Sequence, residues 1–326
     1  MRCPASPRVS VVVPAYGVAH LLGEALRSLQ AQTFADWEAI VVDDGAPDDV
    51  AAAFAPFADD KRFRLLMTDN KGLATARNRA IGAARAPLIS LLDGDDLYAP
   101  RYLERMVAAI EADPTLGFVC CDAMVFGKDE HPPRRYSSIY PMSGGISLRR
   151  VLDRSFVVFV AATLRRSALE EIGGFDAALE ACEDLDAWIR LLSAGWRAAF
   201  VPEPLACYRR RRDSMSSSDR RMARASCVTY EKACRALQGR DEQAVAEREF
   251  EAHTQRLRWL DGEALILSGD VSAGLLRLAD AGDRSLRWRL GLGLMRRAPR
   301  LAAFLLRLRG LLPDRIGGRA LSRFPS

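Results

Sequence analysis

The 326-residue sequence contains few of the residues that would support nucleophilic or zinc chemistry. It has only three histidines, His20, His131 and His253, and none is near a candidate serine or cysteine nucleophile, so a catalytic triad has little support. Its seven cysteines are odd in number and scattered, without a C-x-x-C pair or a nearby histidine. This arrangement argues against a zinc site or a disulfide framework and favours a reducing cytoplasm.

Long hydrophobic runs and an N-terminal targeting segment are missing as well. The longest apolar runs, such as FVVFVAATL at 156–164, are far shorter than the roughly 20 residues that a membrane-spanning helix needs. The N-terminus leads almost directly into VSVVVPAY, without the basic start, apolar stretch and cleavage site of a signal peptide. With 49% hydrophobic and 27% charged residues, the composition is that of an ordinary globular protein. We therefore expect a cytoplasmic protein.

Negative charge is nearly absent from the last part of the chain. After residue 283 the sequence has eleven arginines and a single acid, Asp314, which gives this tail a net charge of +10. The whole chain carries +5, so residues 1–283 carry −5. An acidic main body argues against binding of nucleic acid.

Strand-like and helix-like segments alternate along the first part of the chain. Apolar or β-branched runs are separated by segments whose apolar residues recur with a helical period. This alternation indicates βαβ units on a mostly parallel sheet, and hence an α/β fold. We expect strands at 9–13, 37–42, 62–67, 88–92 and 116–126, and helices at 21–32, 72–84 and 101–112.

Three of the expected strands end in polar groups, namely PAY at 14–16, DDG at 43–45 and DGDD at 93–96. Ligands of such sheets bind beyond the carboxyl ends of the strands, so we expect the three groups to meet along one edge. Two like charges 4 Å apart repel by about 1 kcal/mol in water and about 4 kcal/mol at an effective dielectric of 20. A divalent cation would relieve this repulsion, because Mg²⁺ and Mn²⁺ commonly bind one or two carboxylates together with substrate phosphates.

Six segments, in this order within about residues 8–218, resemble the motifs of glycosyltransferase family 2, which comprises inverting enzymes with the GT-A fold. They are VSVVVPAY, VVDDGAPDD, NKGLATARNRAI, LLDGDD, GGFDAALEACEDLDAWIRL and YRRRRDSMS. The resemblance implies a Rossmann-like, mostly parallel sheet flanked by helices. We therefore expect a catalytic GT-A domain at 1–218 and a helical C-terminal region with a basic amphipathic tail at 219–326.

The resemblance also implies which residues bind the nucleotide of a sugar nucleotide. Pro14, Ala15 and Tyr16 would line the nucleotide pocket, with Tyr16 near the base. Asp44 would contact the nucleobase, and Asp43 would support it.

Further motif positions imply roles in the chemistry. Arg77 would lie close to the base or the diphosphate. Asp93 and Asp95 would form the D-x-D element, with Asp95 as the metal ligand and Asp93 reaching the ribose or a metal-bound water. Asp184 would be the catalytic base, with Glu183 beside it facing the acceptor. The implied cofactor is Mn²⁺ or Mg²⁺.

The sequence departs from the family pattern at several positions. Gly17 stands where the family often has Asn, and Ala80 stands where a Gly is common. In the last motif the family usually has a histidine, and this chain has Arg211. An arginine is no metal ligand but pairs well with phosphate, so we interpret Arg211 as a direct contact to the diphosphate.

Each motif also has a structural interpretation. The DGDD stretch is compatible with a solvated turn whose aspartate caps the next helix, and Asp48 or Asp49 with helix caps. Glu183 and Asp184 open an expected helix, where acids are favourable by about 0.3–1 kcal/mol in any case. The run RRRR at 209–212 is compatible with a solvated basic loop.

The C-terminal third has no motif of this kind. Residues 221–280 indicate two or three amphipathic helices. Beyond Arg284, apolar residues between Leu301 and Leu308 would share one helical face flanked by Arg300 and Arg307. Such a segment either lies on an anionic membrane surface or packs on protein, and both alternatives stay open.

Taken together, these features predict a metal-dependent, inverting, hexosyltransferase-like enzyme that uses a nucleotide-diphosphate sugar, with UDP as the favoured nucleotide. Its acceptor would be a saccharide or a lipid-linked molecule in cell-envelope polysaccharide or glycolipid synthesis, at the inner face of the membrane. One alternative is a non-catalytic nucleotide-sugar-binding regulatory or scaffold protein. A nicotinamide-dependent oxidoreductase is a poorer alternative, because the chain has PAYGVAHLLG where that class needs G-x-G-x-x-G.

Overall fold

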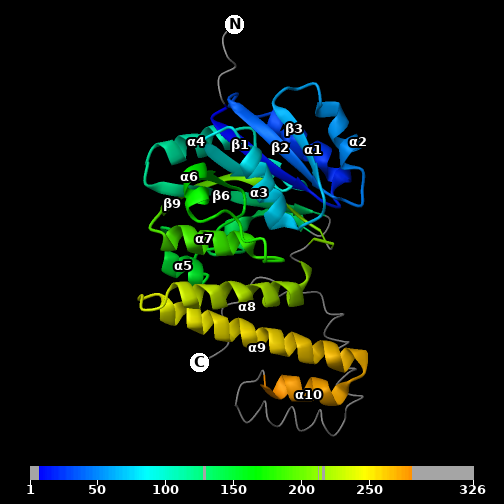
Figure 1. Ribbon diagram of the computed structural model, residues 1–326, viewed down its shortest axis with the longest axis vertical. Helices are drawn as coiled ribbons and strands as arrows, with labels where there is room; N and C mark the ends of the chain where they lie inside the picture. Colours follow the sequence, from blue (N-terminus) through cyan, green and yellow to red (C-terminus); the bar gives the residue numbers. More distant parts are fainter. Residues whose placement is uncertain (1–6, 128–129, 212, 215–216, 281–326) are drawn as a thin grey trace. The chain divides into compact units, whose positions relative to one another are not determined.

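A computed structural model describes residues 7–127, 130–211, 213–214 and 217–280 of the chain (Figure 1). The chain forms two compact units, Met1–Ser214 and Met215–Ser326. The first contains all the strands among the described residues, and the second is helical where it is described.

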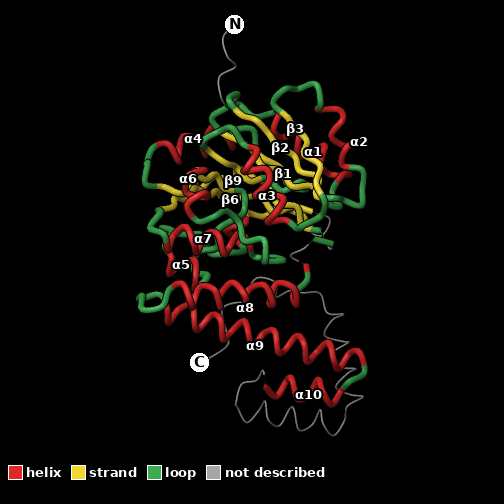
Figure 2. Tube along the Cα trace, in the orientation of Figure 1, coloured by secondary structure: helices red, strands yellow, loops and turns green. Residues whose placement is uncertain are grey.

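The first unit is built on a mixed sheet, drawn in yellow in Figure 2. Its strand order is β3-β2-β1-β4-β8-β6-β9-β5, and β7 pairs with β6 outside this path. The strands are β1 (Val9–Ala15), β2 (Trp37–Asp44), β3 (Phe63–Thr68), β4 (Leu88–Leu91), β5 (Leu97–Tyr98), β6 (Leu116–Gly127), β7 (Glu130–Arg135), β8 (Ala162–Arg165) and β9 (Arg197–Arg210).

The first four strands of the sheet are parallel, as the alternation of strands and helices predicts. Every residue of β1 and β2 is buried, which is typical of parallel strands that are covered on both faces. The strand β8 lies antiparallel between β4 and β6, whereas β6 and β9 are again parallel. The predicted α/β fold is therefore confirmed, with a mixed sheet because β5, β7 and β8 pair antiparallel.

Helices flank this sheet and bury apolar faces with helical spacing. In α1, Leu22, Ala25, Leu26 and Leu29 are buried at i, i+3, i+4 and i+7. The helix α3 packs on β1 and β2, and α4 packs on β6, β8 and β9. The α-helices of this unit are α1 (Ala19–Gln30), α2 (Val50–Phe54), α3 (Leu73–Ala83), α4 (Tyr102–Glu111), α5 (Leu148–Leu152), α6 (Arg166–Glu171) and α7 (Glu183–Ser193), and two short 3₁₀ turns are η1 (Ala55–Phe57) and η2 (Tyr136–Ser138).

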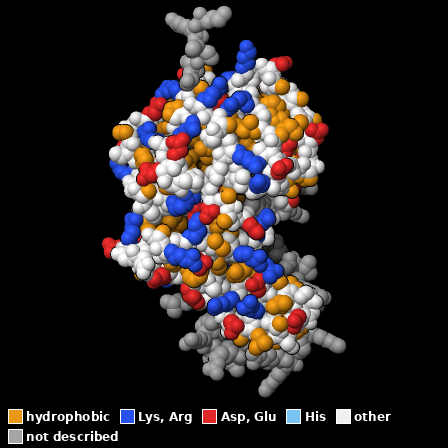
Figure 3. Space-filling view, in the orientation of Figure 1, with side chains coloured by type: hydrophobic (Ala, Val, Ile, Leu, Met, Phe, Trp, Pro, Cys, Tyr) orange, Lys and Arg blue, Asp and Glu red, His pale blue; other side chains and the backbone are white. Residues whose placement is uncertain are grey.

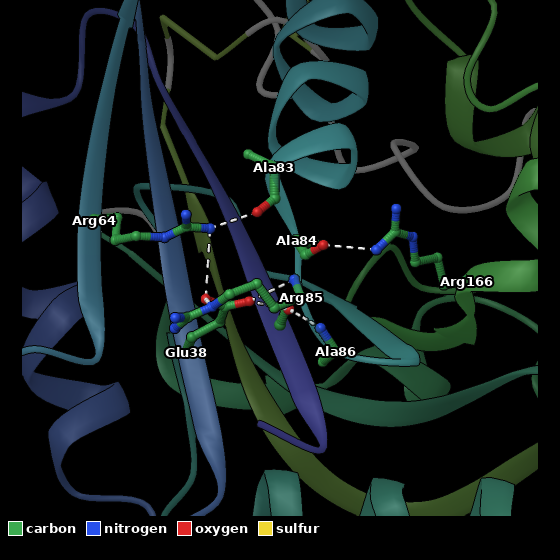
Figure 4. Close-up of polar contacts among 8 residues, drawn as sticks. Glu38, Arg64, Ala83, Ala84, Arg85, Ala86 and Arg166 are labelled. Carbon is green, nitrogen blue, oxygen red and sulfur yellow. Dashed lines mark hydrogen bonds and ion pairs between the residues drawn. The ribbon is translucent and has the colours of Figure 1, made fainter. Parts of the chain in front are cut away.

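A buried acid ties the amino-terminal ends of the parallel strands together (Figure 4). Glu38 in β2 accepts hydrogen bonds from the Ser10 hydroxyl in β1 (2.7 Å) and from the backbone N–H and Nε of Arg85 (2.7 and 2.8 Å). Nη2 of Arg64 in β3 lies 3.4 Å from Oε2 of Glu38. Burial alone would raise the pKa of Glu38, but these donors and charges outweigh it and hold the pKa below its ordinary value. This network lies at the edge of the sheet opposite to the carboxyl ends of β1, β2 and β3.

The second unit consists, in its described part, of three helices that pack in sequence. They are α8 (Asp219–Ala236), α9 (Gln243–Ser268) and α10 (Val271–Asp280), in agreement with the two or three helices that the sequence predicts. The helices α9 and α10 approach closely because Gly262 and Gly274 face each other, where an added Cβ on Gly262 would lie 2.9 Å from the Gly274 carbonyl oxygen. The basic tail that was predicted to bind membrane or protein lies outside the described residues.

Charged side chains are distributed over the surface of the first unit. On the face that Figure 3 shows, basic side chains are interspersed with acidic ones. Among the residues that the structure describes, no helix is long and apolar enough to cross a membrane.

Candidate active site

The carboxyl ends of β1, β2 and β4 bring the three predicted polar groups to one edge of the sheet. Ala15 at the end of β1 is in register with Asp43 at the end of β2, and Leu92 donates its N–H to the Val12 carbonyl (3.0 Å). The turn after β4 lies directly against β1, because a Cβ on Gly94 would be 2.8 Å from the Pro14 carbonyl oxygen. Glycine at this position therefore lets the acidic turn approach the first strand.

The β1–α1 turn leaves one aromatic ring on the surface. Pro14 and Ala15 are buried in the strand, whereas the Tyr16 side chain is 53% exposed and is available to stack on a planar ligand. Asp48, which follows β2, accepts the N–H groups of Gly17 (3.0 Å) and Ala19 (2.6 Å). Asp48 thus binds two N–H groups at the start of α1 and sets the turn that carries Tyr16. The predicted helix cap is Asp49, which accepts the N–H of Ala52 (2.8 Å) at the start of α2.

The two aspartates that end β2 are engaged with backbone groups inside the protein. Asp43 accepts the N–H of Ala46 (2.9 Å). Asp44 is only 3% exposed and accepts the N–H groups of Lys71 (3.2 Å) and Gly72 (2.9 Å), which precede α3. These carboxylates hold the two turns in place. Their contact with a nucleobase stays a prediction.

The acidic turn after β4 pairs each of its three carboxylates with a basic partner or an N–H. The Asp93 carboxylate, 28% exposed, accepts Nη2 of Arg77 at 2.7 Å. Asp95 accepts Nε of Arg211 at 3.0 Å, and Asp96 accepts the backbone N–H of Arg209 at 2.8 Å. This turn does not cap the next helix, since α4 begins without a side-chain cap.

The acids of this turn also perturb one another. Burial, and next the charge of Asp93, raises the pKa of Asp95 above its ordinary value, although Arg211 opposes the shift. The pKa of Asp96 lies well above its ordinary value, because the side chain is buried beside Asp95 and Asp93. The three acids of the turn thus lie close enough to repel one another.

Arg77 connects this turn to the helix that carries the predicted base. Its guanidinium is 1% exposed and forms ion pairs with Asp93 and Glu183. Burial would lower the pKa of Arg77, but the charges of Asp93, Glu183 and Asp184 outweigh burial and raise it. The guanidinium is thus paired with two acids, and its contact with a base or diphosphate stays a prediction.

The predicted catalytic pair begins α7 and consists of two acids in different surroundings. Cys182, just before the helix, has a left-handed backbone (φ 59°) that turns the chain into α7. Glu183 is buried against Arg77, and its pKa is raised by burial, with Arg77 opposing and Asp184 adding to the shift. Asp184 is half-buried and accepts the N–H of Leu185 (2.7 Å). Of the two residues, Asp184 is the more exposed.

Two residues of the site, Asp96 and Arg209, have no role predicted from the sequence. Arg209 donates to the carbonyl of Asp95 (2.9 Å) and to Glu24 of α1 (2.7 Å), and Asp96 holds the backbone of Arg209. Arg209 and Arg210 belong to β9 and are not part of a solvated loop, because β9 pairs with β6 as far as Arg210. The tyrosine-arginine dipeptide of the last motif is the signal that would have identified Arg209.

The acidic turn supplies part of the ligand set of a divalent cation. The described residues contain no group of three or more His, Cys, Asp or Glu side chains that would hold a metal ion by themselves. Asp93 and Asp95 nevertheless supply two carboxylates, and Mg²⁺ or Mn²⁺ is commonly bound by one or two carboxylates plus substrate phosphates. A cation there would also relieve the repulsion between these acids.

Two curated proteins illustrate the sequence similarity of the chain. The protein EpsE of Bacillus subtilis (strain 168) is 27% identical over 238 residues, which are 71% of this chain and 83% of EpsE. The succinoglycan biosynthesis protein ExoU of Rhizobium meliloti (strain 1021) is 30% identical over 213 residues. That alignment covers 62% of this chain and 61% of ExoU, so the chain spans less than two thirds of that relative.

Solved structures share the fold of the chain, and a family model shows to which protein family the chain belongs. TarS 1–349 of S. aureus, in complex with UDP-GlcNAc, superposes with a TM-score of 0.63 at 17% identity, over 84% of this chain and 79% of that one. The mannosyltransferase PcManGT of Pyrobaculum calidifontis, in complex with GDP-Man and Mn²⁺, gives a TM-score of 0.59 at 23% identity, over 93% of this chain and 84% of PcManGT. The model of glycosyl transferase family 2 matches residues 10–173. The chain therefore belongs to glycosyl transferase family 2 and is a nucleotide-sugar glycosyltransferase with a GT-A-like fold.

Proposed function

We propose that this chain is an inverting glycosyltransferase that moves a hexose from a nucleotide-diphosphate sugar to an acceptor hydroxyl in cell-envelope polysaccharide or glycolipid synthesis. The observation that carries the proposal is the chain of ion pairs from the acidic turn through Arg77 to Glu183, the neighbour of Asp184 in α7. The name of the relative ExoU supports a polysaccharide product. Residues 1–218 would form the catalytic domain, and residues 219–326 a helical extension.

The donor would lie along the carboxyl ends of β1, β2 and β4. The exposed ring of Tyr16 is suited to stack on the base, and Asp44 with Asp43 would fix the pocket from β2. UDP is the favoured nucleotide, and the UDP-GlcNAc complex of TarS and the GDP-Man complex of PcManGT support a donor of this class.

Asp95 and Asp93 would hold Mn²⁺ or Mg²⁺ together with the diphosphate of the donor. When bound, the cation supplies Lewis-acid stabilisation of the charge that develops on the leaving diphosphate. Arg211, whose guanidinium already lies at Asp95, would add hydrogen bonds to the same phosphate oxygens.

Asp184 would accept the proton of the acceptor hydroxyl. The acceptor oxygen then forms a bond to the anomeric carbon while the bond from that carbon to the phosphate oxygen breaks, and the nucleoside diphosphate leaves with the electron pair. Attack from the face opposite to the leaving group inverts the anomeric centre. Glu183 would position Asp184, because Arg77 holds the carboxylate of Glu183 inside the protein.

A comparison of donor binding with transfer tests this proposal. Purified protein is screened for thermal stabilisation by UDP-, GDP- and TDP-sugars with and without Mn²⁺, and the stabilising donor is then used in transfer and donor-hydrolysis assays. We expect Asp184→Asn to bind the donor like the parent chain but to lose transfer, and Asp95→Ala to lose the metal-dependent part of binding. Full transfer activity in Asp184→Asn would remove Asp184 as the base.

A peripheral position at the inner face of the cell membrane is part of the proposal and rests on the sequence of the basic tail alone. Anionic lipid attracts each basic residue near its surface by about 1 kcal/mol. Flotation with anionic liposomes should therefore recover the full chain but not a variant truncated before residue 284. Equal recovery of both proteins would contradict membrane binding by this tail.

A further inference from the structure

The ion pair between Arg211 and Asp95 places a positive charge of the protein on the predicted metal ligand. Nε of Arg211 lies 3.0 Å from Oδ2 of Asp95, and the two side chains are only 17% and 18% exposed. A pair that is mostly withdrawn from water is screened less by salt than one on the surface. The guanidinium therefore neutralises the carboxylate that a cation would otherwise bind.

Arg211 is held more weakly than the other arginines of the site. Arg77 is fully buried between two acids, and Arg209 is fixed by Glu24 and by the carbonyl of Asp95. Among the described residues, the Arg211 guanidinium also pairs with Asp213 at 3.3 Å, whose side chain is 74% exposed. An exposed ion pair of this kind contributes little. Arg211 is therefore the arginine that can leave its carboxylate without breaking a buried network.

We infer, building on the proposed function, that Arg211 is an exchangeable countercharge. It neutralises Asp95 before a divalent cation binds, gives Asp95 up to that cation, and then binds the diphosphate of the donor. One residue would thus have two effects of opposite sign. It would compete with the cation for Asp95 before the donor binds, and it would strengthen binding of the nucleoside diphosphate once the cation is in place.

The two effects can be separated by measuring the cation and the nucleotide independently. Binding of Mn²⁺ alone is measured by the loss of the electron paramagnetic resonance signal of free Mn²⁺, with the full chain and no nucleotide. Binding of UDP and of GDP is measured by calorimetry at saturating Mn²⁺. We expect Arg211→Gln to bind Mn²⁺ about threefold to tenfold more tightly than the parent chain, because the competing charge is gone.

The same variant should bind the nucleoside diphosphate about tenfold more weakly, because one charge-assisted hydrogen bond to phosphate is lost. A histidine variant adds a second test. Arg211→His should also bind Mn²⁺ more tightly, since it removes the positive charge of the guanidinium at neutral pH. Circular dichroism of each variant shows that it is folded, and Arg211→Ala serves as the replacement if the Gln variant is not.

Arg210 provides the matched control, because Arg210→Gln makes the same change in net charge one residue away. Its guanidinium pairs with Glu130 (2.7 Å) and not with the acidic turn, so we expect both affinities to stay within twofold of the parent values. In the double variant Asp95→Asn with Arg211→Gln, the gain in Mn²⁺ affinity should disappear, because the two residues act as one unit.

The Mn²⁺ measurement alone decides the inference. Unchanged or weaker Mn²⁺ binding in Arg211→Gln, or a gain that persists without Asp95, would overturn the exchange. If no variant binds UDP or GDP while the Mn²⁺ gain is present, the exchange at Asp95 stands and the proposed role of the site in donor binding fails. The two results can therefore be distinguished.

Discussion

Replacing Arg77 by alanine is expected to lower the free energy of unfolding of the first unit strongly. The Arg77 guanidinium is 1% exposed and forms ion pairs with Asp93 and Glu183, so its removal leaves two acids without their countercharge. Glu183, 7% exposed, cannot recover its hydration without a rearrangement of α7, whereas Asp93, 28% exposed, is partly solvated already. Most of the loss therefore comes from Glu183.

The magnitude follows from this difference in burial. Breaking a buried ion pair by removing one partner costs about 3–5 kcal/mol, whereas an exposed pair is worth about 0–1 kcal/mol. We expect about 3–4 kcal/mol for Arg77→Ala, since one of its pairs is buried and the other is partly solvated. Arg77→Lys should cost about 1–2 kcal/mol, because an ammonium keeps the charge but does not bridge two carboxylates as a guanidinium fork does.

Urea denaturation followed by circular dichroism at 25 °C measures these differences. Arg79→Ala is the control from the same helix, because the Arg79 side chain donates only to the carbonyl of Asp69 (3.2 Å) at the surface. Its cost should stay within about 0.5 kcal/mol. Adding Glu183→Gln to Arg77→Ala should restore part of the lost stability, because it removes the unpaired buried charge.

The pH dependence gives the same mechanism a second readout. Without Arg77, burial and Asp184 would raise the pKa of Glu183 further than in the parent chain, where Arg77 opposes them. A raised folded pKa means that the stability is present at low pH and is lost as the pH rises through that pKa. The deficit of Arg77→Ala should therefore shrink toward acid pH, and Glu183→Gln should abolish this trend. A loss below about 1 kcal/mol that does not depend on pH would refute the reasoning.

Three further changes probe the network of Glu38 at the amino-terminal ends of the strands and two turns around the site. Glu38→Gln should remove part of the loss of stability in acid, because the folded protein holds the pKa of Glu38 below 4.5. The stability that ionised Glu38 contributes is present above its unfolded pKa and is lost as the pH falls, and urea midpoints that are the same for the variant and the parent chain at both pH 7 and pH 4 would contradict this. Gly94→Ala should cost about 1–3 kcal/mol and weaken UDP binding in calorimetry, because its Cβ would lie 2.8 Å from the Pro14 carbonyl oxygen. Asp48→Ala should cost about 1 kcal/mol in urea denaturation, because the N–H of Ala19 loses its cap; an unchanged midpoint would argue against the cap.

Local patterns in the sequence were sufficient for the elements of the parallel half of the sheet. The expected strands at 9–13, 37–42 and 62–67 coincide with β1, β2 and β3 to within about two residues, because a buried strand and its flanking turn residues are recognisable within a few positions. The sequence interpretation did not anticipate β7 or β8. The short strand β8 pairs antiparallel with β4, which lies far from it along the chain, and such pairing leaves little local pattern. The strand β7 pairs antiparallel with β6, which precedes it directly.

The sequence by itself determined which acids could form a site, because the motifs place Asp93, Asp95 and Asp184 directly after a strand or at the start of a helix. Only the tertiary structure decided the partner of each charge. Arg77 meets Glu183 across 106 residues, and Arg211 meets Asp95 across 116. The physical reason is that secondary structure depends on neighbours a few residues apart, whereas ion pairs depend on which strands lie side by side in the sheet.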